Sequence, residues 1–166
     1  MTDLRPLCRA LPAATFLILS LAPTGRAATP QELAALWCKA AWQHDDVAAT
    51  ELMAPSLQEL VARATEASAA FALRFPDEKP PLGDGLPLSA FPDPTQECRA
   101  ESLSAEEIVL LYTPLPSGEG QWRDKLLLES IPGTGDPNQV LVADILFDLP
   151  RGHRLSGWLI EAAAIK

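Results

Sequence analysis

Residues 106–148 read EEIVLLYTPLPSGEGQWRDKLLLESIPGTGDPNQVLVADILFD. Three runs in this stretch, residues 106–113, 122–131 and 139–148, are rich in residues that favour β-strands. Two segments rich in glycine and proline separate them, which is typical of hairpin connections. The pattern predicts an antiparallel meander of three strands, with residues 98–103 as a candidate fourth strand.

The chain before this meander carries the signals of helices. Thr29, Pro30 and Glu32 form the pattern of a capping box with proline at the first helical position, and they predict a helix that ends near residue 44. Apolar side chains at helical spacing predict a second helix from Pro55 to about residue 75, before Pro76. We further expect a short helix or turn at 47–53, a proline-rich surface loop at 76–94 and a C-terminal helix at 155–165.

Helices followed by an antiparallel meander predict an α+β fold, and 166 residues suffice for a single domain. The chain carries 13 basic and 22 acidic residues, for a formal net charge of −9. Residues 1–27 contain three arginines and one aspartate, a net charge of +2, so the rest of the chain carries −11. This acidity argues against nucleic acid or an anionic membrane surface as the main partner, because both reward positive charge.

Residues 1–27 have the layout of a secretory signal peptide. Two arginines precede the apolar run of residues 10–22, and Ala27 ends a Gly-Arg-Ala cleavage pattern. We expect cleavage after Ala27, or as a second choice after Ala28, and a mature domain in a bacterial periplasm. The alternative is an uncleaved anchor, but the apolar run is shorter than the roughly 18 residues of a membrane helix, so no stable membrane insertion is expected after cleavage.

Two cysteines, Cys38 and Cys98, remain when Cys8 leaves with the signal peptide. An even pair in an oxidising compartment predicts one disulfide, and two buried free thiols are the alternative. No CxxC motif and no paired-histidine spacing is present in the sequence, so we predict no metal site and no cofactor. His44 and His153 follow an H-x-D…H order, but a helix end is a poor place for such a ligand set.

Four short motifs follow one another along the chain: Leu36-Trp37, LGDGLPL at 82–88, VADILF at 142–147 and LSGWL at 155–159. Their order resembles the nuclear-transport-factor-two-like superfamily, and more narrowly a secreted bacterial family of unknown function within it. The resemblance implies a cone in which a curved antiparallel sheet wraps around N-terminal helices. Leu86, Leu88 and Val142 depart from the narrow family's pattern. Such cones host isomerases, dehydratases, binding modules and immunity-type proteins, so the resemblance implies a shape and not a chemistry.

Asp144 is the first candidate for chemistry, because it lies in a strand whose two faces are both largely apolar. A half-buried aspartate with a raised pKa acts as a base in some enzymes, and Tyr112 or His44 are candidates to assist it. The alternatives are structural. Asp144 then pairs with a basic side chain or a helix N-terminus, Tyr112 is a packing residue, and His44 ends a helix.

A second candidate site is an anion-binding cluster. Trp122 and Arg123 open a strand, and Arg151 and His153 precede the last helix. Basic residues just before a helix N-terminus favour anions. The alternative is ordinary solvated surface charge.

The function we favour from the sequence is non-catalytic binding of a small ligand or a protein partner, because no catalytic set is assembled in the motifs. One alternative is a small acid–base isomerase or dehydratase that uses Asp144. Another is a periplasmic immunity or inhibitor protein whose acidic loop faces a basic toxin through Asp77, Glu78, Asp84 and Asp93. A homodimer through the open sheet face is compatible with the apolar alternation of residues 140–147.

Overall fold

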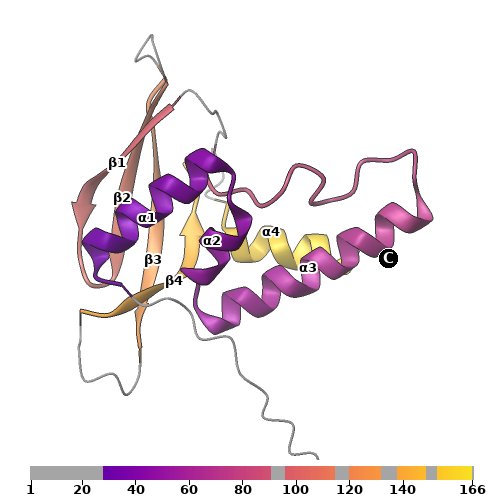
Figure 1. Ribbon diagram of the computed structural model, residues 1–166, viewed down its shortest axis with the longest axis horizontal. Coiled ribbons are helices and arrows are strands. Elements are labelled where there is room, and N and C mark those ends of the chain that lie inside the picture. Colours follow the sequence, from indigo (N-terminus) through magenta and orange to yellow (C-terminus); the bar gives the residue numbers. More distant parts are fainter. Residues whose placement is uncertain (1–27, 91–95, 115–119, 132–137, 149–152, 166) are drawn as a thin grey trace, which may run out of the picture.

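The computed structural model describes residues 28–90, 96–114, 120–131, 138–148 and 153–165. Three helices come first, four strands follow, and one helix ends the described chain (Figure 1). The helices are α1 (Pro30–Gln43), α2 (Asp46–Glu51), α3 (Pro55–Arg74) and α4 (Leu155–Ala164). The strands are β1 (Gln96–Leu103), β2 (Glu107–Pro114), β3 (Trp122–Ser130) and β4 (Val140–Leu146). The predicted α+β class and the candidate fourth strand are confirmed. The predicted signal peptide lies outside the described residues.

The side-chain caps predicted from the sequence begin the first helix, and a second cap begins the next one. The Thr29 hydroxyl accepts a hydrogen bond from the Glu32 N–H at 3.3 Å, and the Glu32 carboxylate accepts one from the Thr29 N–H at 3.0 Å. This capping box begins α1, and His44 ends it in the left-handed conformation, with φ of 50°. Asp45 then begins α2 by accepting a hydrogen bond from the Ala48 N–H at 2.9 Å. The two caps turn the chain between α1 and α2.

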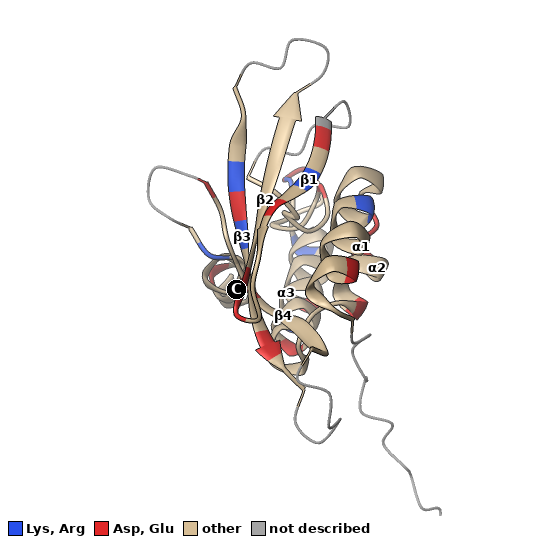
Figure 2. Cartoon of the chain, turned by 90° about the vertical axis from the view of Figure 1, so that its left-hand side faces the viewer, with Lys and Arg blue, Asp and Glu red and all other residues tan. Residues whose placement is uncertain are grey.

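The four strands form one antiparallel sheet in the order β1-β2-β3-β4. Tyr112 pairs with Trp122, and Leu110 pairs with Asp124, so these side chains share the inner face of the sheet. Arg123 pairs with Leu111 and lies on the opposite, outer face of the sheet. Basic and acidic residues alternate in sequence along β3, as the ribbon colours of Figure 2 show. The helix α1 lies across the inner face, as Figures 1 and 2 both show. Its Trp37 is fully buried in the core.

The predicted disulfide is present. Cys38 of α1 and Cys98 of β1 are bonded, with their Cα atoms 5.5 Å apart. Cys98 pairs with Tyr112 in the sheet register, so the bond lies on the inner face beneath α1. It ties the edge strand β1 to the first helix.

The other edge of the sheet is covered by two short segments. Ala28 and Val140 exchange backbone hydrogen bonds of 3.4 and 3.0 Å. The Val142 N–H donates to the Leu52 carbonyl at 2.9 Å, and the Val142 carbonyl accepts from the Ala54 N–H at 2.8 Å. These bonds satisfy backbone groups of β4 that would otherwise be open to pairing with another chain.

The expected cone is not confirmed, because the placement of helices relative to strands differs from it. Among the described helices, α1 lies across the open sheet, while α3 and α4 contact it at the edge strand β4, pack against each other and extend beyond the sheet as an arm (Figure 1). The buried face of α3 is narrow and includes the polar Ser68. No helix in the described ranges combines the length and the apolarity that crossing a membrane requires.

Candidate functional site

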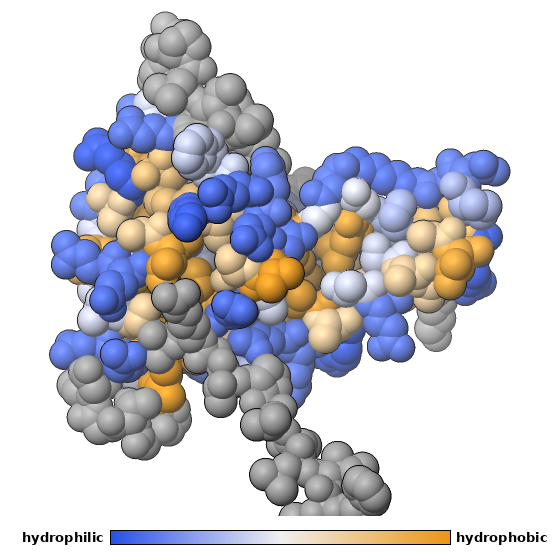
Figure 3. Space-filling model, in the orientation of Figure 1, coloured by the Kyte–Doolittle hydropathy of each residue, from blue (hydrophilic) through white to orange (hydrophobic). Residues whose placement is uncertain are grey.

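A groove of about 760 Å³ lies between α2, α3 and the proline-rich segment. In Figure 3, hydrophobic and weakly polar surface lies between hydrophilic rims along the arm of α3. Most lining side chains are small or apolar. The lining residues are Asp46, Val47, Thr50, Glu51, Gln58, Val61, Thr65, Ser68, Ala69, Ala72, Pro80, Leu82, Gly85 and Leu86. Three successive stretches of chain, α2, α3 and the segment after α3, therefore build one concave surface.

Residues 80–90 are here called the strap segment, and its first part, through Pro80, Leu82, Gly85 and Leu86, forms one wall of the groove. The Leu82 N–H donates to the Ser68 hydroxyl of α3 at 3.1 Å, and the Leu86 N–H donates to the Asp46 carboxylate at 3.0 Å. Gly85 has a φ of +88°, and a Cβ at this position would lie 2.8 Å from an Asp46 oxygen. Glycine is therefore required where the strap segment approaches α2.

The C-terminal half of the strap segment is anchored to the core of the sheet. The Trp37 indole N–H donates to the Leu88 carbonyl at 3.3 Å. The Ala90 N–H donates to Oδ2 of Asp124 at 2.8 Å. Leu88 and Ser89 are buried. The strap segment thus has four anchors, one each on α1, α2, α3 and β3.

Asp124 is fully buried on the inner face of the sheet. Its second oxygen, Oδ1, accepts a hydrogen bond from the Asp148 N–H at 2.9 Å. Burial raises the pKa of Asp124 to about 6, the charge of Asp148 adds to the rise, and the two backbone N–H donors oppose it. This carboxyl is an unusual group in a core that is otherwise almost entirely apolar.

Tyr112 lies beside Asp124 on the same face. Its ring stacks on Trp122, with centroids 5.4 Å apart and planes at 8°. Its buried hydroxyl has no hydrogen-bond partner among the described residues. Burial and the Asp124 charge raise the Tyr112 pKa, and the indole of Trp37 is close enough to oppose the rise, although its N–H donates to Leu88. Tyr112 is therefore a neutral core residue.

The structure does not bring Asp144 and Tyr112 together. Asp144 pairs with Leu127 in the register, on the outer face, whereas Tyr112 lies on the inner face. The Asp144 carboxylate accepts hydrogen bonds from the Ser156 N–H at 3.0 Å and the Ser156 hydroxyl at 2.7 Å. Arg154 lies 3.6 Å from it. Asp144 serves as a cap for α4, which matches its structural alternative, and we propose no acid–base site there.

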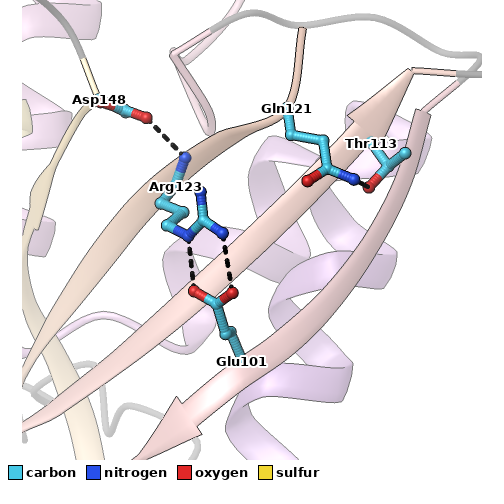
Figure 4. A network of polar contacts seen from close by, with 5 residues as sticks. All are labelled: Glu101, Thr113, Gln121, Arg123 and Asp148. Atoms are coloured by element: carbon cyan, nitrogen blue, oxygen red, sulfur yellow. Dashed lines mark hydrogen bonds and ion pairs between the residues drawn. The ribbon is translucent and has the colours of Figure 1, made fainter. Parts of the chain in front are cut away.

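The structure does not bring Trp122 and Arg123 of the predicted anion cluster together. Trp122 is buried on the inner face, and Arg123 lies on the outer face, where Glu101 binds it through two hydrogen bonds of 2.6 and 2.9 Å (Figure 4). The hydrogen bonds of this pair lower the pKa of Glu101 and raise that of Arg123. His153 is exposed, and Arg151 lies outside the described residues.

The remaining candidates lie at the surface. His44 is exposed at the end of α1. Among the described residues, no group of three or more metal-ligating side chains is placed to hold an ion. Of the acidic loop residues, Asp77 and Glu78 are exposed, Asp84 forms an ion pair with Lys79, and Asp93 lies outside the described residues.

Sequence reasoning missed Asp124 because it stands between Arg123 and Lys125 and looks like part of a surface charge run. A usable signal was present. Trp122, Asp124 and Leu126 alternate in a strand, so a buried Trp122 and Leu126 place Asp124 on the buried face. Comparisons with protein-family models, with curated proteins and with solved structures gave no match for this chain.

Proposed function

We propose that this protein is a non-catalytic binding protein that holds a small, elongated and largely apolar molecule in the groove along α3. The observation that carries the proposal is the groove itself, whose volume of about 760 Å³ falls within the range of small-molecule sites. A strap segment with four separate anchors keeps one wall of this groove in place. A preformed concave surface of this kind reduces the entropy lost when a ligand binds.

The chemistry of the lining favours an apolar ligand. The Ser68 hydroxyl is occupied by the Leu82 N–H, and the Thr50 hydroxyl donates to the Asp46 carbonyl at 2.6 Å. The Gln58 side chain donates to the carbonyls of Thr50 and Met53. These polar groups are used within the protein, so the surface they leave is recognised through shape and apolar contact.

The end of the groove next to α2 is acidic, since Asp46 and Glu51 both line it. The chain as a whole also carries a net charge of −9. Carboxylates near a ligand disfavour anions by like-charge repulsion. We therefore infer a neutral or cationic ligand and not a fatty-acid anion.

The groove is tested with N-phenylnaphthylamine, a neutral apolar dye that fluoresces when it leaves water. We expect saturable binding to the wild-type protein and a loss of affinity of at least about tenfold in Ala69→Trp, because the new ring fills the groove. Ala70→Trp is the matched control, since Ala70 is an exposed neighbour on α3 that does not line the groove. Equal binding to the wild type and Ala69→Trp would place the dye elsewhere and remove the proposal.

Export to an oxidising compartment is part of the same proposal. A Cys38–Cys98 disulfide within one chain and the pairing of Ala28 with Val140 support it. If the chain is cleaved after Ala27, Ala28 keeps its carbonyl for the Val140 N–H, whereas cleavage after Ala28 removes that acceptor. We expect the protein recovered from a bacterial periplasm to have the mass of a chain that begins at Ala28, less the two hydrogens lost when the disulfide forms. A mass that includes residues 1–27 would refute export with cleavage.

The resemblance to the nuclear-transport-factor-two-like superfamily stays a prediction. A helix, α1, packed across one face of an antiparallel sheet supports it. The arm of α3 and α4 is a departure from a cone, and the groove that we propose as the binding site lies on this arm.

A further inference from the structure

The strap segment and the end of β4 meet at a single carboxyl group. Asp124 accepts a hydrogen bond from the Ala90 N–H with one oxygen and from the Asp148 N–H with the other. Ala90 is 34 residues before Asp124 in the sequence, and Asp148 is 24 residues after it. One fully buried side chain therefore holds two distant backbone segments side by side.

We propose that Asp124 is a pH-sensitive latch for the strap segment, and that proton binding at its carboxyl favours the closed strap and hence the intact groove. The part that concerns the groove depends on the proposed function, while the latch itself does not. The ligand whose affinity the latch would control is the apolar molecule proposed above.

The direction of the effect follows from desolvation. With the strap segment closed, Asp124 is fully buried, and no described Lys, Arg or His forms an ion pair with it. Its negative charge is then costly, and its pKa rises to about 6. When the strap segment moves away, water reaches the carboxyl and its pKa returns towards the ordinary value of 3.8. The closed state therefore holds the proton more tightly, and by linkage the proton favours closure.

The same sign holds for global unfolding. Between pH 3.8 and about pH 6, the folded protein keeps a proton on Asp124 that the unfolded chain releases. The contribution of Asp124 to the free energy of unfolding is therefore fully present below this interval and is lost as the pH rises through it. A buried aspartate with a lowered pKa has the opposite dependence.

The groups around Asp124 set the interval in which the latch acts. The Asp148 charge, from the end of β4, raises the pKa of Asp124, and Tyr112 from β2 is neutral because its own pKa is raised. The helix α1 contributes the neutral indole of Trp37 to the same cluster. Arg123, the adjacent cation on β3, lies on the opposite face and is bound by Glu101.

The latch is tested without any ligand by nuclear magnetic resonance. We expect the backbone amide signals of Ala90 and Asp148 to titrate together with a midpoint near pH 6, because both N–H groups donate to the titrating carboxyl. We also expect the protection of the Leu86 and Ala90 amides from solvent exchange, corrected for the intrinsic rate, to fall at least about fivefold above that midpoint. A midpoint near 3.8, or protection that does not change, would overturn the latch.

The variant that isolates the carboxyl is Asp124→Asn, which stays uncharged at every pH and keeps one acceptor oxygen. We expect it to lose the shared titration and the change in protection. Asp144→Asn is the matched control, since it alters the other buried aspartate of the sheet, and we expect it to keep both effects. A titration near pH 6 that persists in Asp124→Asn would assign the effect to another group and refute the proposal.

Coupling to the groove is measured by the affinity for N-phenylnaphthylamine at about pH 5 and about pH 7.5, where we expect at least about threefold weaker binding at the higher pH. If the dye binds at neither pH, the proposed function is contradicted. The nuclear magnetic resonance result then remains the test of the latch. Binding that is blocked by Ala69→Trp but is equal at both pH values supports the proposed function and refutes coupling by Asp124.

Discussion

Loss of the Cys38–Cys98 disulfide is expected to lower the free energy of unfolding by about 4 kcal/mol. The bond joins residues 60 positions apart, so it removes much conformational freedom from the unfolded chain. In the folded state it fastens β1, whose contacts among the described elements are limited to β2 and α1. An edge strand with so few neighbours gains most from a covalent attachment to the core.

The measurement is urea unfolding of Cys38→Ser/Cys98→Ser against the wild-type protein, with both followed by tryptophan fluorescence. The wild-type protein in reductant is the control for the substitution itself, because it loses the bond and keeps the sulfur atoms. Agreement between the variant and the reduced protein assigns the effect to the bond. A difference from the oxidised protein below about 1 kcal/mol would contradict the prediction.

Trp37→Ala is expected to destabilise the protein by about 3–5 kcal/mol. The Trp37 side chain is fully buried between α1 and the inner face of the sheet, so the truncation leaves a large cavity. It also leaves the Leu88 carbonyl without its indole donor and removes one anchor of the strap segment. We therefore expect weaker dye binding in the groove as well as lower stability.

Trp42→Ala is the control on the same helix, because the Trp42 side chain is 57% exposed. We expect it to cost less than about 1 kcal/mol. Trp37→Phe separates the two roles of Trp37, since it keeps most of the packing and loses the N–H donor. Equal unfolding free energies for Trp37→Ala and Trp42→Ala would mean that α1 does not pack on the sheet as described.

The local elements of this fold could be predicted from the sequence because their signals are local. The capping box at Thr29, the proline at the start of α3 and the alternation in β2 each act over a few residues. Hydrogen bonds within a helix cap or a hairpin join neighbours in the chain, so a short window contains both partners. The disulfide was also predictable, since only one pairing of the remaining cysteines exists.

The candidate site was less predictable. Asp144 drew attention as a carboxylate among apolar residues, and the sequence left a catalytic base and a structural cap as alternatives. The choice depends on where α4 begins relative to β4, because the N–H and the hydroxyl of Ser156 both donate hydrogen bonds to the carboxylate. That placement results from packing between α4 and β4, and the sequence pattern of neither element shows it.

The sequence by itself determined the α+β class, the antiparallel strands and the cysteine pair, because these depend on periodicity, caps and composition. Only the tertiary structure decided which carboxyl group is removed from water. Asp124 lies between two charged residues and looks exposed in the sequence, yet the strap segment brings Ala90 onto it from 34 residues away. The groove likewise depends on tertiary contacts, since Ser68 and Asp46 hold this segment against α3 and α2. Burial and concavity belong to contacts between distant segments, and local sequence patterns do not encode them.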